Sequence, residues 1–252
     1  MSRMPFLNTY IDNLTEEQAL KKTEMIINEG NPAYIVTPNI DHFVRLESDS
    51  RFRGIYKKAS LILTDGMPVV LLSKLTSRPI KEKISGSDFY YSLCALCEER
   101  KFSIFLFGAG EGVAEEAARK TLIRYPNLNI SGYFSPPYGF ETNEDQLRVA
   151  LSRINEAAPD VLVVALGSPK QEYFIADNYM QYNAVLSLGL GATLDFVAGR
   201  IKRAPHWMQV CGLEWLYRLC KEPKRLAKRY LIDDIKILPI ILKYLNSPRE
   251  TQ

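Results

Sequence analysis

Residues 161–172 read VLVVALGSPKQE: an apolar run, a turn, and then a cluster of polar side chains. An apolar run without alternation is typical of a strand buried on both faces of a parallel sheet. Pro169 suits the start of a helix, which we expect over Pro169–Tyr182. The stretch therefore predicts one strand–turn–helix unit of an α/β fold, with its polar residues at the carboxyl end of the strand.

The same alternation of short apolar runs and longer amphipathic stretches occurs along most of the chain. The expected strands are Ala33–Thr37, Leu61–Thr64, Phe102–Phe107, Leu128–Tyr133, Val161–Leu166 and Val185–Leu188. The other expected helices are Thr15–Asn28, Phe43–Lys58, Asp88–Arg100, Gly112–Tyr125 and Glu144–Ala157. This alternation predicts right-handed βαβ units, and hence a Rossmann-like, mainly parallel sheet flanked by helices.

The charge of the chain is unevenly distributed and divides the sequence near Gly199. Residues 200–252 hold twelve Lys and Arg against five Asp and Glu, whereas residues 1–199 hold 20 against 24. We therefore expect an α/β body over 1–199 and a basic, helical appendage over 200–252 that meets an anionic partner. Anionic lipid, nucleic acid and a phosphorylated ligand all fit this charge.

The apolar content of the appendage favours a membrane among those partners. Residues 231–245 are rich in Leu and Ile but also contain Asp233, Lys236 and Lys243. The stretch is too polar to span a bilayer, which needs about 20 apolar residues, but it can lie on a membrane surface. The first residues lack the apolar core of a signal peptide. We expect a cytoplasmic protein bound peripherally to the inner face of the membrane, with no nucleic-acid partner.

Cysteine and histidine give no sign of a metal or redox centre. Cys94 and Cys97 form a C-x-x-C, but the residues around them have the pattern of a helix interior and no second pair follows. His42 and His206 have no companions at ligand spacing, and no Asp-x-Asp occurs. We expect buried cysteines in a reducing compartment, no metal site and no cofactor.

Polar residues directly after the expected strands are the candidates for chemistry, because the carboxyl ends of parallel strands meet at one edge. Asp65 follows Leu61–Thr64, where a carboxylate can act as a general base or can cap the next helix. Thr37 and Asn39, separated by one proline, either orient sugar hydroxyls or only shape a turn. The residues alone leave both alternatives open.

Other expected strands are followed by glycines instead of such polar side chains. Gly108 and Gly110 precede a helix, where bare backbone N–H groups can bind a diphosphate or merely form a tight turn. Val113 occupies the third glycine position of a dinucleotide fingerprint, and no P-loop motif occurs. An NAD-dependent oxidoreductase is therefore a weaker alternative than a protein that contacts a nucleotide diphosphate.

The appendage has the basic residues to neutralise such a diphosphate. Arg218, Arg225 and Arg229 lie seven and four residues apart, so they share a face of one continuous helix unless Pro223 interrupts it. They form either a clamp for diphosphate or lipid headgroups, or a plain solvated face. A non-catalytic membrane-binding module would need only this appendage, and the polar strand ends would then have no purpose.

Taken together, these motifs resemble the WecG/TagA/CpsF glycosyltransferases, family 26 of the glycosyltransferase classification. The resemblance extends from Ala33 to Arg229 and lies in the order and spacing of the motifs. They are Thr37-Pro38-Asn39, Thr64-Asp65-Gly66, Gly86-Ser87-Asp88, Phe107-Gly108, Gly167-Ser168-Pro169-Lys170-Gln171-Glu172, Gly189 to Asp195, Arg203-Ala204-Pro205 and Gly212-Leu213-Glu214-Trp215-Leu216-Tyr217-Arg218.

The resemblance implies a fold of the kind called GT-E and transfer of a sugar from a UDP-sugar to a polyprenyl-diphosphate-linked sugar at the membrane. In the teichoic-acid branch, the donor is UDP-N-acetylmannosamine and the acceptor carries N-acetylglucosamine. Relatives transfer N-acetylmannosaminuronic acid or glucose instead. The resemblance also implies inversion at the anomeric carbon and self-association of the protein.

For individual residues, the resemblance implies that Asp65 is the base. The positions that line the pocket are Thr37, Asn39 and Gln171. The basic positions that complete the site from the appendage are Arg218, Arg225 and a third at Lys228 or Arg229. We expect further substrate contacts at Gly108, Gly110, Lys170, Gly189, Gly191, Asp195 and Arg203. Arginines and backbone amides, without metal, would then stabilise the leaving UDP.

Overall fold

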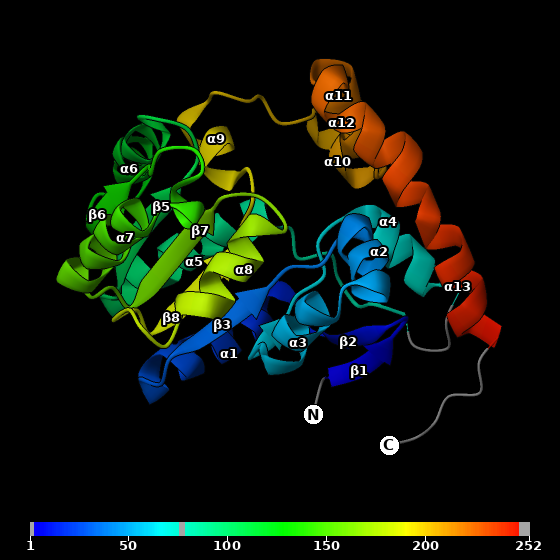
Figure 1. Ribbon diagram of the computed structural model, residues 1–252, viewed down its shortest axis with the longest axis horizontal. Helices are drawn as coiled ribbons and strands as arrows, with labels where there is room; N and C mark the ends of the chain where they lie inside the picture. Colours follow the sequence, from blue (N-terminus) through cyan, green and yellow to red (C-terminus); the bar gives the residue numbers. More distant parts are fainter. Residues whose placement is uncertain (1–2, 76–78, 247–252) are drawn as a thin grey trace.

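The computed structural model describes residues 3–75 and 79–246, and its centre is a six-stranded parallel sheet (Figure 1). The strands are β3 (Ala33–Val36), β4 (Leu61–Ile62), β5 (Ser103–Gly108), β6 (Asn129–Phe134), β7 (Val161–Ala165) and β8 (Leu186–Gly189). Their order across the sheet is β4-β3-β8-β7-β5-β6, and every pairing is parallel. The predicted Rossmann-like α/β fold is confirmed.

Helices cover both faces of the sheet, which explains the unbroken apolar run in β7. Val161 and Val163 face one layer and Leu162 and Val164 the other, and all four are fully buried. The first layer contains α1 (Glu16–Glu29), α5 (Gly86–Arg100), α6 (Val113–Arg124) and α9 (Thr193–Ala198). The second contains α2 (Ile40–Ser48), α3 (Ser50–Lys58), α4 (Met67–Ser73), α7 (Glu144–Ala157) and α8 (Lys170–Asn178), with a 3-10 turn, η1 (Phe140–Thr142).

Two helices show how local sequence determines their structure, and the prediction for the cysteines is confirmed. Thr15 and Gln18 form a reciprocal capping box at the start of α1. Cys94 and Cys97 are both free and fully buried in α5, as expected for a helix interior. Because burial raises the pKa of both thiols, they stay protonated and act as small apolar residues.

One predicted helix is wrong and one pair of strands was missed. The stretch Phe43–Lys58 is two helices, because Asp49 is extended and its carboxylate accepts a hydrogen bond from Phe52 N at 2.9 Å, which caps α3. An antiparallel hairpin, β1 (Arg3–Phe6) and β2 (Thr9–Asp12), precedes α1. Its Asp12 carboxylate accepts a hydrogen bond from Ile62 N in edge strand β4 at 3.0 Å. The hairpin therefore covers an edge of the main sheet.

The appendage is helical and folds back on the body. Its helices are α10 (His206–Val210), α11 (Glu214–Lys221), α12 (Pro223–Lys228) and α13 (Ile237–Asn246), with a π-helical turn, η2 (Arg229–Asp233), and a 3-10 turn, η3 (Asp234–Lys236). Ile237 and Ile240 are 8% and 6% exposed and belong to the same apolar core as Phe43 of α2. The boundary at Gly199 stays a prediction, since this packing joins the two parts.

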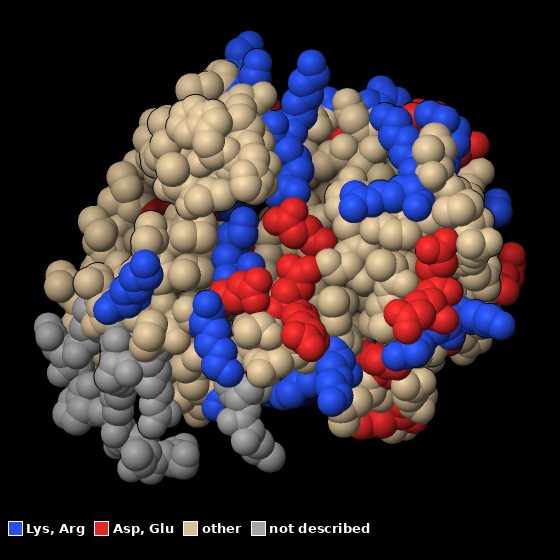
Figure 2. All heavy atoms as spheres, turned by 180° about the vertical axis from the view of Figure 1, so that it is seen from behind, with Lys and Arg blue, Asp and Glu red and all other residues tan. Residues whose placement is uncertain are grey.

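The surface of the appendage combines uncharged and basic regions. In Figure 2, the lobe at upper left, where α10 and α11 lie, is largely uncharged and has basic side chains along its top. Trp207 and Val210 of α10 are 61% and 60% exposed. Within the described ranges, no helix is long and apolar enough to cross a membrane.

Candidate functional site

The carboxyl ends of the strands open into two adjoining cavities. The strand-end cavity, about 300 Å³, lies over β3, β7 and β8, and the appendage cavity, about 430 Å³, lies between the body and the appendage. The residues that line both are Asn39, Asp65, Ser87, Phe196, Arg218 and Arg229. Side chains from strand ends and from the appendage therefore meet at one junction, where chemistry between two ligands can take place.

The strand-end cavity has a polar wall built by the turns after β3, β7 and β8. Thr37 donates a hydrogen bond to Gly189 O at 3.2 Å. Gln171 Oε1 accepts a hydrogen bond from Gly191 N at 2.9 Å, so this amide side chain shapes the turn after β8. A Cβ at Gly189 would lie 2.8 Å from Gln171 Nε2, which explains the need for glycine there. Gly191 and Asp195 also line this cavity.

The appendage cavity has a more apolar wall. Met67 and Pro68 of α4 line it from the body, and Leu238 of α13 lines it from the appendage. The rings of Trp215 and Tyr230 meet edge to face at 5.9 Å and complete the wall. The two cavities therefore suit ligands of different polarity: a polar ligand over the sheet and one with an apolar part under the appendage.

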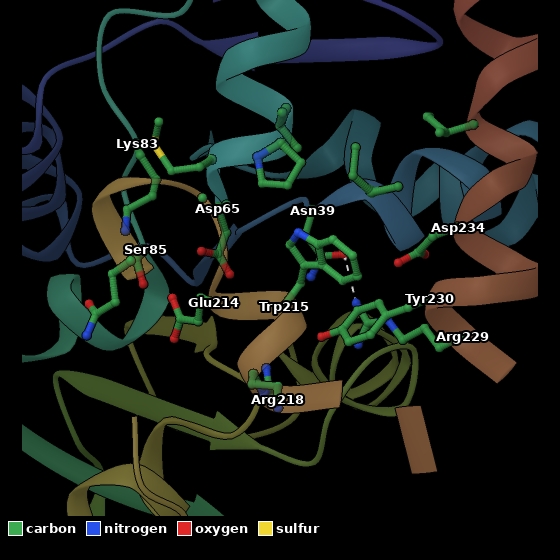
Figure 3. Close-up of a pocket in the computed structure, with 18 of the residues that line it drawn as sticks. Asn39, Asp65, Lys83, Ser85, Glu214, Trp215, Arg218, Arg229, Tyr230 and Asp234 are labelled. Atoms are coloured by element: carbon green, nitrogen blue, oxygen red, sulfur yellow. Dashed lines mark hydrogen bonds between the residues drawn. The ribbon is translucent and has the colours of Figure 1, made fainter. Parts of the chain in front are cut away.

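Asp65 lies at the junction, and the helix-cap alternative for it is wrong. Gly66 is the N-cap of α4, and no side-chain hydrogen bond caps that helix. Burial raises the pKa of Asp65 to about 6, and the nearby Glu214 carboxylate adds to the shift, while Lys83 and Arg218 oppose it. Figure 3 shows Asp65, Glu214 and Lys83 around the same part of the cavity. A carboxylate that titrates near pH 6 is well matched to work as a general base.

Two arginines reach the junction from the appendage, but not as one helix face. α11 ends at Lys221 and α12 begins at Pro223, so the predicted continuous helix is interrupted, as the proline allowed. Arg218 lies 5.5 Å from the ring of Phe196. Arg229 donates a hydrogen bond to Asn39 Oδ1 at 3.1 Å. Tertiary packing, and not helical periodicity, therefore brings the two guanidinium groups together.

Some predicted residues lie elsewhere or outside the description. Lys170 pairs with Glu141 and lies over the ring of Tyr138 at 4.4 Å, and it is not among the residues described as lining either cavity. Lys228 is exposed and likewise absent from both described linings. Gly108 and Gly110 flank Ala109, which lines the strand-end cavity. The side chain of Arg225, in α12, lies outside the described part of the structure.

Arg203 holds the appendage to the body and is not part of the described cavity walls. Its Nη1 atom lies 2.5 Å from Asp88 Oδ1 in α5, and its Nη2 atom donates to Gln209 Oε1 in α10 at 2.9 Å. Its Nε atom is 3.9 Å from Glu214 Oε1 in α11. Burial alone would raise the pKa of Asp88, but the hydrogen bond and charge of Arg203 outweigh it and lower that pKa. Arg203 therefore positions α11 over the junction.

Sequence reasoning missed several residues of the site. Glu214, Lys83 and Ser85 line the appendage cavity, and His42 lines the strand-end cavity. Glu214 lies in the GLEWLYR motif, but nothing in its spacing pairs it with Asp65. His42 follows the Thr-Pro-Asn motif by three residues, and its polarity in an apolar helix face was the available signal. Among the described residues, no group of His, Cys, Asp and Glu side chains could hold a metal ion.

Asp65, with its raised pKa, and two arginines lie where a polar and an apolar cavity meet at the edge of a Rossmann-like sheet, which suits the transfer of a group between two bound ligands. The chain belongs to the glycosyl transferase WecG/TagA/CpsF family, whose model matches residues 4–251. Nearly the whole chain, body and appendage, is therefore covered by one family.

Curated relatives agree with this assignment. The chain is 35% identical over 221 residues to the N-acetylglucosaminyldiphosphoundecaprenol N-acetyl-beta-D-mannosaminyltransferase of Bacillus subtilis, covering 87% of this chain and 80% of that protein. It is 33% identical over 225 residues to the Bacillus spizizenii protein of the same name, covering 89% and 84%. The Staphylococcus aureus protein of that name is 28% identical over 243 residues, covering 96% and 91%. The chain is a glycosyltransferase.

Proposed function

We propose that the protein transfers N-acetylmannosamine from UDP-N-acetylmannosamine to an N-acetylglucosamine linked to a polyprenyl diphosphate. The observation that carries the proposal is the position of Asp65 at the junction of a polar and an apolar cavity. The names of the curated relatives support the same sugar and the same kind of acceptor. The donor occupies the strand-end cavity, and the lipid-linked acceptor occupies the appendage cavity.

The geometry suggests a single displacement. Asp65 takes the proton of the acceptor hydroxyl while that oxygen forms its bond to the anomeric carbon. The bond between the anomeric carbon and the β-phosphate oxygen breaks on the opposite side, so the configuration inverts and UDP leaves with the bonding electrons. Arg218 and Arg229, which line both cavities, meet the charge that develops on the diphosphate.

The reaction is proposed to need no divalent ion. The guanidinium groups of Arg218 and Arg229, which line both cavities, would supply the positive potential that a metal supplies in other sugar transferases. Activity should then persist in excess chelator. Loss of turnover with chelator, restored by Mg²⁺ or Mn²⁺, would contradict this part of the proposal.

The protein is further proposed to act at the inner face of the cytoplasmic membrane, where a polyprenyl-linked acceptor resides. The exposed apolar side chains of α10, η2 and α13 support this, among them Trp207, Leu231 and Leu242, with basic side chains close by in Figure 2. Binding to vesicles with anionic lipid should weaken as salt rises. Self-association, as the resemblance implies, is to be measured by sedimentation with and without vesicles.

A donor panel tests the proposal directly. Release of UDP is measured from a series of UDP-sugars, with a short polyprenyl-diphosphate N-acetylglucosamine as acceptor. We expect turnover with UDP-N-acetylmannosamine that depends on the acceptor, and much less with the glucose or N-acetylmannosaminuronic acid donors. Preferred turnover of either of those donors would replace the proposed sugar, and tight NAD binding without any UDP-sugar turnover would overturn the reaction class.

A further inference from the structure

Four residues that line the strand-end cavity have a buried polar atom without a hydrogen-bond partner in the described part of the chain: His42 Nε2, Ser168 Oγ, Arg218 Nε and Arg229 Nε. Glu172 Oε2, next in sequence to the lining residue Gln171, is a fifth such atom, and His42 and Glu172 are each 2% exposed. Buried polar groups are nearly always hydrogen-bonded, so unpartnered ones beside a cavity indicate a ligand or an ordered water. His42 itself lines the strand-end cavity, next to Thr37, Ser168 and Gln171.

The surroundings of His42 determine which of its nitrogens carries the proton. Burial, with the charges of Arg229 and Arg45, lowers the pKa of His42 to about 3, so the ring is neutral at physiological pH. Burial raises the pKa of Tyr56 well above its ordinary value, so Tyr56 keeps its proton. The Tyr56 hydroxyl lies 2.9 Å from His42 Nδ1, and no other acceptor for its proton is described, so the tautomer in which Tyr56 donates to Nδ1 leaves fewer buried groups unsatisfied. The ring proton is therefore on Nε2, which makes that atom a donor.

Glu172 provides an acceptor next to this donor. Its Oε1 atom accepts a hydrogen bond from Gln171 Nε2 at 2.8 Å and lies 3.9 Å from His42 Nε2, too far for a hydrogen bond. The pKa of Glu172 is raised, chiefly by burial and also by the Asp41 charge, whereas the hydrogen bonds from Gln171 and from its own backbone N–H, and the nearby Ser168 hydroxyl, oppose that shift. Its Oε2 atom remains available to accept.

A neutral N–H donor beside a free carboxylate oxygen matches one functional group in particular. A hydroxyl group both accepts and donates, so it can satisfy His42 Nε2 and Glu172 Oε2 together. A carboxylate or a phosphate in this place would bring a buried negative charge that the neutral His42 ring does not offset. The pair is therefore suited to a sugar hydroxyl and not to the diphosphate.

We infer that His42 and Glu172 bind one ring hydroxyl of the donor sugar and so take part in selecting that sugar. The inference rests on the proposed function, because it places the donor in the strand-end cavity. Gln171 connects this pair to the turn after β8, since its two amide atoms contact Glu172 and Gly191. Tyr56 acts one step further away, by fixing the ring proton of His42.

Binding of UDP and of UDP-N-acetylmannosamine to the full chain separates the sugar from the nucleotide. We expect His42→Phe, Glu172→Gln and the wild type to bind UDP equally, by calorimetry. Each variant should bind UDP-N-acetylmannosamine about tenfold more weakly than the wild type, the effect of one lost hydrogen bond. Tyr56→Phe is a matched change of a buried side chain that leaves His42 and Glu172 in place. It should weaken the binding of UDP-N-acetylmannosamine less than His42→Phe does.

Monodeoxy donors, lacking the 3-, 4- or 6-hydroxyl, identify the group that is bound. One of them should bind to the wild type about tenfold more weakly than the parent donor does. The same deoxy donor should bind to His42→Phe with the same affinity as the parent donor. If His42→Phe does not fold, Glu172→Gln carries the same comparison. If every deoxy donor loses the same affinity in the wild type and in the variants, the inference is overturned. The proposed function still stands in that case, provided that the wild type transfers the sugar. A wild type that binds no UDP-sugar would overturn both.

Discussion

Asp65 combines a partly buried position with neighbours of both charges, and its role can be tested by one substitution. In Asp65→Asn, we expect kcat to fall by about 10²- to 10⁴-fold, because the acceptor hydroxyl loses its base. The folded pKa of about 6 exceeds the ordinary 3.8, so the ionised carboxylate destabilises the fold at neutral pH. The variant should therefore melt no lower than wild type at pH 7, and the wild type should gain stability relative to it as pH falls from about 7 to 4. Turnover near the wild-type rate would remove Asp65 as the base.

Glu214 is expected to set the pH at which that base works. The active form is ionised Asp65, so kcat/KM should fall as pH drops below about 6. The Glu214 charge raises the pKa of Asp65, so Glu214→Gln should move the acid limb about 0.5 to 1 pH unit lower. A pH–rate profile of both proteins with the same donor measures the shift. An unmoved acid limb would mean that Glu214 does not influence the base.

Gly189 is the residue whose missing side chain makes room for Gln171. In Gly189→Ala, the new Cβ would lie 2.8 Å from Gln171 Nε2, so Gln171 must move and its hydrogen bond from Gly191 N is strained. We expect kcat/KM to fall on the order of 10- to 100-fold, as displaced positioning groups do.

Gly54→Ala is the matched control for that change. A Cβ at Gly54, in the middle of α3, meets nothing within 4 Å. It should raise the free energy of unfolding by about 0.5–1 kcal/mol and leave turnover unchanged. Unaltered donor kinetics in Gly189→Ala would show that the position of Gln171 is not critical.

Among the elements, α11 must be placed most accurately, because it brings both Glu214 and Arg218 to the junction. Arg203 fixes it through Asp88 of α5 and Gln209 of α10. Arg203→Ala should lower the free energy of unfolding by about 1–3 kcal/mol, lower kcat, and speed proteolysis of the segment before α10.

Lys202→Ala, one residue away, is the control for the loss of a positive charge. Lys202 is exposed. Its removal should change stability by less than about 0.5 kcal/mol and leave activity intact. Equal effects of the two alanine variants would contradict the positioning role of Arg203.

Two of the elements show where prediction from local sequence patterns fails. The split between α2 and α3 follows from a single side chain, Asp49, whose cap on Phe52 N overrides a continuous amphipathic pattern. The hairpin β1–β2 was missed because each of its strands has only four residues, although its apolar side chains, Met4, Phe6 and Ile11, are buried in the core. By contrast, β5 and β7 were predictable, since burial on both faces demands an unbroken apolar run.

On the scale of the molecule, the body and the appendage depend on each other. Removing residues 200–252 leaves all six strands in place but deletes Arg218 and Arg229 and uncovers the α2 surface that Ile237 and Ile240 bury. We expect a folded body with a lower melting temperature and little transfer activity, because the appendage cavity and its cations are lost. Full activity of the truncated body on a soluble acceptor would leave the appendage a tethering role alone.

The amino-acid sequence by itself determined the parallel sheet, the helical basic appendage and the candidate base. Apolar runs, turn residues and charge counts are local properties, and Asp65 could be found because every strand of a parallel sheet ends at the same edge. Only the tertiary structure decided how the site is assembled. Arg229 meets Asn39 across 190 positions of sequence, Glu214 raises the pKa of Asp65, and His42 faces a cavity with an unpartnered N–H. Such contacts depend on how the appendage folds back over the strand ends, and no sequence spacing encodes that distance.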